Sequence, residues 1–108
     1  MAWIYLLGAG LLEVLWASMM KQSDGLSRPV PTLIMLVSML ASFALLTLAL
    51  RSLPLGTGYA IWTGIGAMGA FIVGVIAFGD ALTLGRVLSV VLILTGIVGL
   101  KLTTGNAP

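Results

Sequence analysis

The chain has 108 residues, of which 60% are hydrophobic and 7% are charged, and its mean hydropathy is +1.22. Soluble domains carry about 25% charged residues, so this composition excludes an ordinary soluble domain and predicts an integral membrane protein. The net charge of +2 is too small and scattered for a nucleic-acid surface, and the absence of cysteine and histidine excludes disulfides and the usual zinc ligands. We therefore expect no metal, no other cofactor and no nucleic-acid partner.

Charged residues border four apolar segments and, with one exception, stay out of them. These segments predict an all-α membrane protein with four transmembrane helices at about residues 2–21, 30–51, 56–78 and 84–103. Each segment supplies roughly the 20 residues that a helix needs to cross about 30 Å of hydrocarbon. The connections are short, which forces neighbouring helices antiparallel. The sequence thus predicts a single four-helix transmembrane domain over residues 1–108.

The exception is Glu13, which lies inside the first segment. It precedes Lys21 by eight residues, roughly 12 Å of helical rise, so its carboxyl group is expected well inside the hydrocarbon layer. An ionised acid costs at least about 2.5 kcal/mol there, and such residues usually mark an ion or substrate path. Burial favours the protonated group and a nearby cation favours the charged one. Glu13 is therefore a candidate site where proton and cation compete, or else a protonated group that hydrogen-bonds between helices.

Helical spacing places Gly10 and Trp16 on the same face as Glu13. Trp16 can donate its indole N–H to the carboxylate, or it packs against lipid or a neighbouring helix. Gly10 either keeps the space beside the carboxylate open or serves helix packing. In the second segment, Ser42 is a candidate hydrogen-bond partner of Glu13, although a serine in a membrane helix often bonds its own backbone.

The third segment contains two aromatic residues, Tyr59 and Trp62, on one stripe. Their ring faces can line a cation site, although aromatic residues at this spacing also occur in plain packing. Gly64 and Gly66 remove side chains from successive turns and predict close packing or a bend near the middle of the helix. A bend there would suit a protein that opens alternately to either side of the membrane.

The fourth segment and the loops bear on assembly. Small residues at Ser89 and Gly96 favour a close helix contact. Basic residues normally collect on the cytoplasmic side, but here they divide almost evenly between the two sides. Lys21, Arg28 and Arg86 are expected on one side, and Arg51 and Lys101 on the other. The chain then has either a weakly biased topology or a dual one, in which two copies pair antiparallel.

Three motifs resemble those of the small multidrug resistance transporters. They are "LLEVLW" at 11–16, "SLPLGTGYAIWTGIGAMGA" at 52–70 and "LTGIVGLK" at 94–101, and the resemblance extends from Trp3 to about Lys101. The motifs are most similar to the guanidinium-exporting branch of the family. Trp16 is the most informative position, because quaternary-ammonium exporters of the family usually lack this tryptophan.

The resemblance implies a multi-pass protein of the bacterial inner membrane, not an enzyme, that exports guanidinium in exchange for protons by alternating access. It implies an antiparallel, dual-topology homodimer with Glu13 as the shared proton and substrate site. The implied lining of this site is Gly10, Trp16, Ser42, Tyr59 and Trp62. The implied dimer contact is Ser89, Leu92, Ile93, Gly96 and Ile97. The expected partners are guanidinium, protons, a second copy of the chain and the lipid bilayer.

Three other functions remain open at this point. The first is export of small quaternary ammonium ions or other hydrophobic cations, which have no N–H groups to donate to a carboxylate. The second is an anion channel, against which the buried carboxyl group of Glu13 argues. The third is a non-transporting subunit of a larger membrane complex.

Overall fold

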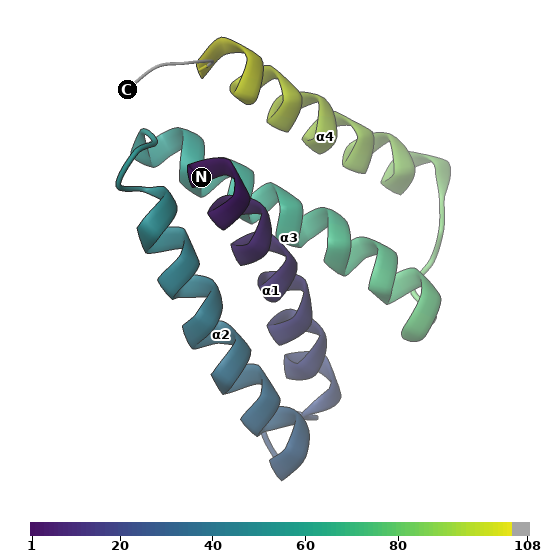
Figure 1. Cartoon of the computed structure of the whole chain (residues 1–108). Helices are drawn as coiled ribbons and strands as arrows, with labels where there is room; N and C mark the ends of the chain where they lie inside the picture. The colour runs from purple at the N-terminus through teal and green to yellow at the C-terminus, as the bar shows by residue number, and fades with distance from the viewer. Residues whose placement is uncertain (105–108) are drawn as a thin grey trace.

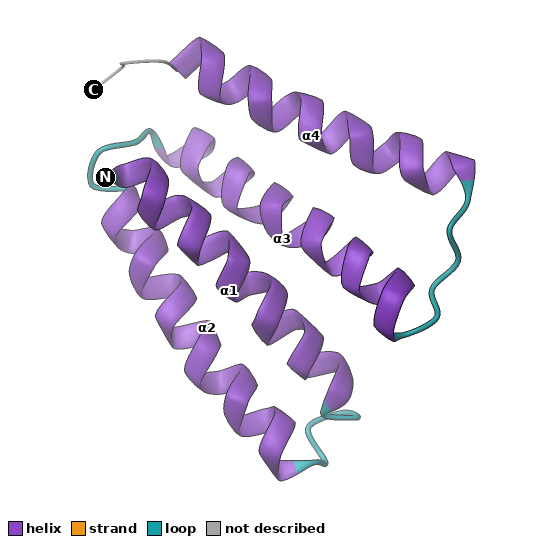
Figure 2. Ribbon diagram, turned by 45° about the vertical axis from the view of Figure 1, so that its right-hand side comes forward, coloured by secondary structure: helices purple, strands orange, loops and turns teal. Residues whose placement is uncertain are grey.

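The computed structural model describes residues 1–104, which form four helices joined by short turns (Figure 1). Helix α1 spans Ala2–Gln22, α2 spans Pro29–Ala49, α3 spans Leu55–Ala77 and α4 spans Leu84–Thr104. Each is long and apolar enough to cross a membrane, as the composition predicts. Residues 105–108, the last four of the predicted domain, lie outside the described residues. The start of α1 and the end of α4 lie at the same end of the molecule (Figure 2).

Helix α2 is shorter than the sequence predicts, because it ends at Ala49 and not near residue 51. The N–H groups of Arg51 and Ser52 donate to the carbonyl oxygens of Leu48 and Ala49 at 3.3 and 3.2 Å. These contacts span three residues each and tighten the chain into a turn. Pro54 follows, and a proline disfavours helical backbone in the residue before it. The turn brings α3 back antiparallel to α2.

The four helices form a flat arrangement. Helix α1 packs along both α2 and α3, and α4 packs along α3 (Figure 1). The Cα atoms extend over 43 × 34 × 16 Å, so the molecule is thin in one direction. Such a shape leaves little protein interior in which to enclose a polar site.

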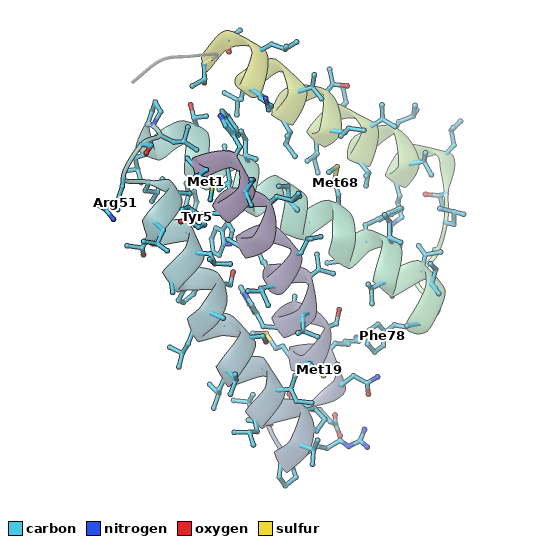
Figure 3. All side chains as sticks on the ribbon, in the orientation of Figure 1. Met1, Tyr5, Met19, Arg51, Met68 and Phe78 are labelled. Carbon is cyan, nitrogen blue, oxygen red and sulfur yellow. The ribbon has the colours of Figure 1, made fainter. Side chains whose placement is uncertain are left out.

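The apolar core lies where α2 turns into α3. It consists of Leu6, Ala9, Ala49, Leu53, Ile61 and Trp62. Elsewhere, large apolar side chains extend outward along all four helices (Figure 3), and no residue of α4 is buried. An apolar exterior of this kind suits a chain surrounded by lipid.

Glycines of α3 allow close contact with both neighbouring helices. A Cβ atom at Gly69 would overlap Val14 of α1, and one at Gly64 would overlap Ile97 of α4. Membrane helices associate mainly by close packing, because lipid is as apolar as their side chains. The close packing predicted for Gly64 is therefore present, and Gly69 makes a contact of the same kind.

The contact stripe predicted on α4 is divided between two faces. Ile93 and Ile97 approach Gly64 of α3 in the same chain, because the missing side chain at Gly64 leaves room for them. Leu92 is 72% exposed, and Ser89 and Gly96 are exposed as well. Only the latter three residues point away from the rest of the chain.

The Gly69 contact predicts the effect of adding one methyl group. Gly69→Ala should lower the free energy of unfolding by about 1–3 kcal/mol, the usual cost of overpacking, because Val14 is too stiff to move aside. Gly56→Ala is the matched control, since a Cβ atom at Gly56 meets nothing within 4 Å. Unfolding in detergent, followed by circular dichroism, measures both variants. Equal stability of the two would contradict this account of the α1–α3 contact.

Candidate functional site

The carboxyl group of Glu13 packs directly against Gly66 of α3. A Cβ atom at Gly66 would overlap this carboxyl group, so the glycine supplies the space that Glu13 occupies. The Oε1 atom of Glu13 is buried and has no hydrogen-bond partner among residues 1–104. A buried polar atom without a partner costs about 1–3 kcal/mol, and more if it is charged. The position therefore favours binding of a proton or a cation.

Trp16 does not make the hydrogen bond to Glu13 that the helical spacing allows. Its Nε1 atom is also buried and has no partner among the residues that the structure describes. The indole ring instead packs edge-on against Phe43 of α2, with centroids 6.3 Å apart and an angle of 74° between the rings. The site thus contains one unpaired acceptor and one unpaired donor three residues apart on α1.

Ser42 also differs from its expected role as a partner of Glu13. Its buried hydroxyl group donates to the carbonyl oxygen of Ala9 at 2.7 Å and accepts from Nε1 of Trp62 at 3.1 Å. A hydroxyl group has a single proton to donate, so none remains for Glu13. Because Ala9, Ser42 and Trp62 belong to α1, α2 and α3, this short network joins the three helices.

Four aromatic rings form a continuous row beside this network. Tyr59 and Trp62 are 5.6 Å apart between centroids, as their spacing on one stripe predicts, and Trp62 and Phe43 are 5.8 Å apart. Phe43 then contacts Trp16. Trp62 is 6% exposed and Tyr59 is 54% exposed. The row thus leads from a buried ring to one that a ligand or a second chain can reach.

Sequence reasoning missed Phe43 and the role of Gly66. Phe43 follows Ser42, which is a weak signal, and its position between Trp16 and Trp62 depends on how α1 and α2 cross. For Gly66 the sequence predicts close packing or a bend, but not its partner, and the structure shows it packed against the carboxyl group of Glu13. Helix α3 is continuous over Leu55–Ala77, and a bend at Gly64 or Gly66 stays a prediction.

Of the two interpretations of Gly10, the structure supports helix packing and not an open space beside the carboxyl group. A Cβ atom at Gly10 would overlap Ile65 of α3. Gly10 lies one helical turn before Glu13, so the close approach of α1 and α3 at Gly10 also sets how near Glu13 comes to Gly66. Gly10 thus acts on the carboxyl group indirectly, through the helix separation.

The site chemistry is that of one carboxyl group among aromatic rings. Within residues 1–104, no group of three or more His, Cys, Asp or Glu side chains could hold a metal ion. A carboxylate binds N–H donors through charge-assisted hydrogen bonds, and aromatic faces attract cations. This arrangement is suited to a small organic cation.

The Ser42 network predicts a large cost for losing one hydroxyl group. Ser42→Ala leaves the indole N–H of Trp62 and the carbonyl oxygen of Ala9 without a partner. We expect a loss of about 1–3 kcal/mol in the free energy of unfolding. Ser38→Ala is the matched control, because the buried Ser38 hydroxyl bonds only within α2, to Ile34 and Met35. If both variants unfold alike in detergent, the network does not stabilise the three-helix contact.

Comparison with known proteins agrees with these features. The sequence profile of the family described as Small Multidrug Resistance protein matches residues 1–93. The chain is 56% identical over 104 residues to a guanidinium exporter of Yersinia pseudotuberculosis, covering 96% of this chain and 100% of the relative. It is 51% identical to a guanidinium exporter of Citrobacter freundii over 96% of this chain and 99% of that relative. With four membrane-spanning helices and this match over most of its length, the chain belongs to the Small Multidrug Resistance family.

Proposed function

We propose that the chain exports guanidinium across the bacterial inner membrane in exchange for protons, with Glu13 as the group for which the two cations compete. The observation that carries this proposal is the buried Oε1 atom of Glu13. The Glu13 carboxyl group lies against Gly66, near the middle of α1, and Oε1 has no hydrogen-bond partner among the described residues. The name of the relatives that share 51–56% of their residues with this chain supports the choice of substrate. The whole chain acts as one transmembrane domain.

Guanidinium fits the chemistry of this site. It is planar and weakly hydrated, and it offers pairs of N–H groups that match the two oxygens of a carboxylate. Its flat face stacks on aromatic rings, for which Trp16, Tyr59 and Trp62 are the candidates. Glu13 supplies the hydrogen-bond acceptors and the negative charge, and the aromatic row supplies the stacking surface.

Exchange follows from the two states of Glu13. In a site away from water the protonated carboxyl group is favoured, whereas a bound guanidinium ion favours the carboxylate. Binding of one cation therefore releases the other, and the linkage is reciprocal. When the site opens alternately to the two sides of the membrane, a proton gradient then drives export of guanidinium. The two open forms need similar free energies for this exchange.

We further propose that two copies act together as an antiparallel homodimer. One chain is too flat to enclose the site, and the face of α4 with Ser89, Leu92 and Gly96 is free of contacts within its own chain. Small residues on an exposed face favour helix pairing in membranes. The basic residues are almost evenly divided between the two ends, which permits insertion in both orientations.

The decisive test is the current that guanidinium produces in membranes containing the reconstituted protein. Glu13→Gln should reduce this current by at least about 30-fold, because truncating one partner of a charged hydrogen-bonded pair costs at least about 2 kcal/mol. Asp80→Asn, an exposed acid in the α3–α4 loop, is the matched control and should leave the current unchanged. In the unmodified protein, each unit of falling pH should raise the apparent Kd for guanidinium, by up to about tenfold. Proton-driven uphill transport by Glu13→Gln would refute the proposal.

Export of quaternary ammonium ions is the competing function within the family. Tetramethylammonium has no N–H group, so it would interact with the aromatic row but make no hydrogen bond to Glu13. Currents with guanidinium, methylguanidinium and tetramethylammonium therefore separate the two functions. We expect guanidinium to give the largest of the three, and a larger tetramethylammonium current would favour the competing function.

Gly66 provides a second test that leaves Glu13 in place. The methyl group of Gly66→Ala would occupy the space of the carboxyl group, which can swing away because it ends a flexible side chain. The helices should stay folded, while the Kd for guanidinium rises by about tenfold or more, the factor for 1.4 kcal/mol. Gly56→Ala controls for the added methyl group on α3. Isothermal titration calorimetry measures both, and an unchanged Kd would show that Gly66 does not position Glu13.

A further inference from the structure

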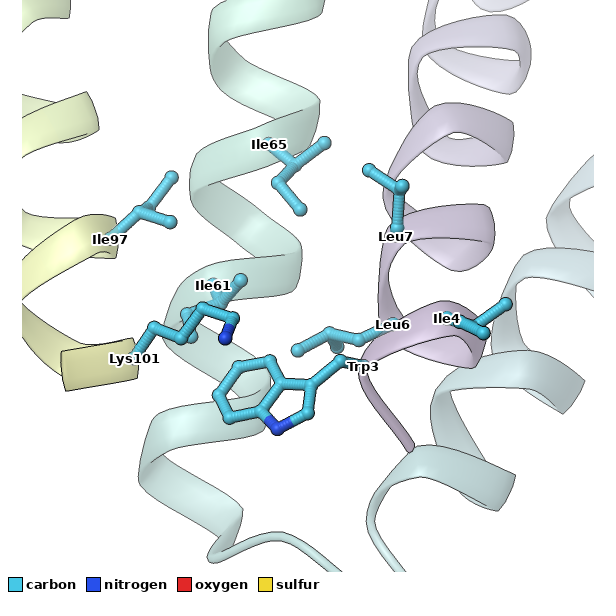
Figure 4. A pocket seen from close by; sticks show the side chains of 8 residues that line it. All are labelled: Trp3, Ile4, Leu6, Leu7, Ile61, Ile65, Ile97 and Lys101. Atoms are coloured by element: carbon cyan, nitrogen blue, oxygen red, sulfur yellow. The ribbon is translucent and has the colours of Figure 1, made fainter. Parts of the chain in front are cut away.

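A second site lies between α1, α3 and α4, apart from Glu13. It is a groove of 320 Å³ lined by Lys101 and seven apolar side chains, among them Trp3, Ile4 and Ile65 (Figure 4). All three helices are long and apolar enough to cross a membrane, so the groove would lie at the depth of the hydrocarbon layer. Apolar cavities do not hold water favourably. A hydrocarbon chain is therefore the occupant that suits this groove.

Lys101 places a positive charge at the mouth of the groove. Its Nζ atom lies 4.9 Å from the centroid of the Trp3 ring, and Figure 4 shows the ammonium group over the indole. The contact is a cation–π interaction, and it places the ammonium group beside the apolar side chains that line the groove. The groove thus has an apolar body and a cationic end.

No acidic side chain is near enough to neutralise this end of the molecule. The chain has three acids, of which Asp24 and Asp80 lie in the loops at the opposite end and Glu13 lies in the middle of α1. Arg51 lies at the same end as Lys101 and lines a smaller cavity together with Met1 (Figure 3). The excess of positive charge here complements an anionic head group.

We propose that this groove binds an anionic phospholipid, with one acyl chain in the groove and the phosphate paired with Lys101. Basic pockets between transmembrane helices are a general means of binding such head groups. The groove adjoins the transport site, because Ile65 lines it and also meets Gly10 of α1. A bound acyl chain would therefore contact Ile65, a residue of the α1–α3 contact.

Lipid retention measured by native mass spectrometry tests the proposal. The full chain is purified with a mixture of phosphatidylglycerol and phosphatidylcholine, and the lipid that stays bound is identified from the mass of the complex. We expect phosphatidylglycerol to be retained in preference, and Lys101→Gln to reduce its retention about fivefold, the factor for one basic side chain at an anionic surface. Lys21→Gln is the matched control and should retain the lipid, because Lys21 lies at the other end of α1 from Trp3 and the groove.

A second variant tests the groove apart from the charge. Ile4→Trp adds bulk at an exposed lining position and should displace the acyl chain, whereas Ile76→Trp, exposed on α3 and outside the groove, should not. Equal retention of the two lipids would overturn the proposal. So would unchanged phosphatidylglycerol retention in Lys101→Gln, or unchanged retention in Ile4→Trp. A change of Ile4→Trp from dimer to monomer would overturn it too, since a second chain would then occupy the groove. Guanidinium currents are read separately and do not enter these outcomes.

Discussion

The contact of a partly buried carboxyl group with a helix backbone is the constraint on which the proposed site depends. Gly66 leaves space for the carboxyl group of Glu13, and Gly10 lets α1 approach α3. The same close contact leaves Oε1 without a partner in the described part of the chain. The packing that makes room for the Glu13 carboxyl group therefore also leaves its Oε1 atom free to bind a proton or a cation. The proposed exchange depends on this property.

Positioning of the site comes from groups that do not touch the carboxyl group. The Ser42 hydroxyl joins the backbone of α1 at Ala9 to the indole of Trp62 on α3, and Phe43 carries the aromatic row across to Trp16. These contacts hold α1, α2 and α3 at a fixed separation. These three helices carry all the residues of the proposed transport site, so the network links the elements from which that site is built.

Helix α4 has a different role from the other three helices. It packs on α3 at Gly64 and places Lys101 over Trp3 of α1, and most of its other large apolar side chains are exposed. Its outer face is the proposed contact with a second copy, and its end contributes Lys101 to the proposed lipid groove. Separating the helix proposed to mediate assembly from those that hold the carboxyl group would allow the proposed dimer contact to form without disturbing Glu13.

Composition and spacing alone determined that the chain crosses a membrane with four helices, and that Glu13 is its exceptional residue. Both follow from the length that a helix needs to span the bilayer and from the free-energy cost of a charged residue inside it. Both apply to each segment whatever its neighbours are. The partners of each polar group were decided only by the tertiary structure. Ser42 bonds Ala9 and Trp62, Trp16 meets Phe43, and Glu13 meets Gly66. Helical periodicity reports which residues share a face, but the neighbour of that face depends on how the helices cross, and this depends on all the small residues at their contacts together.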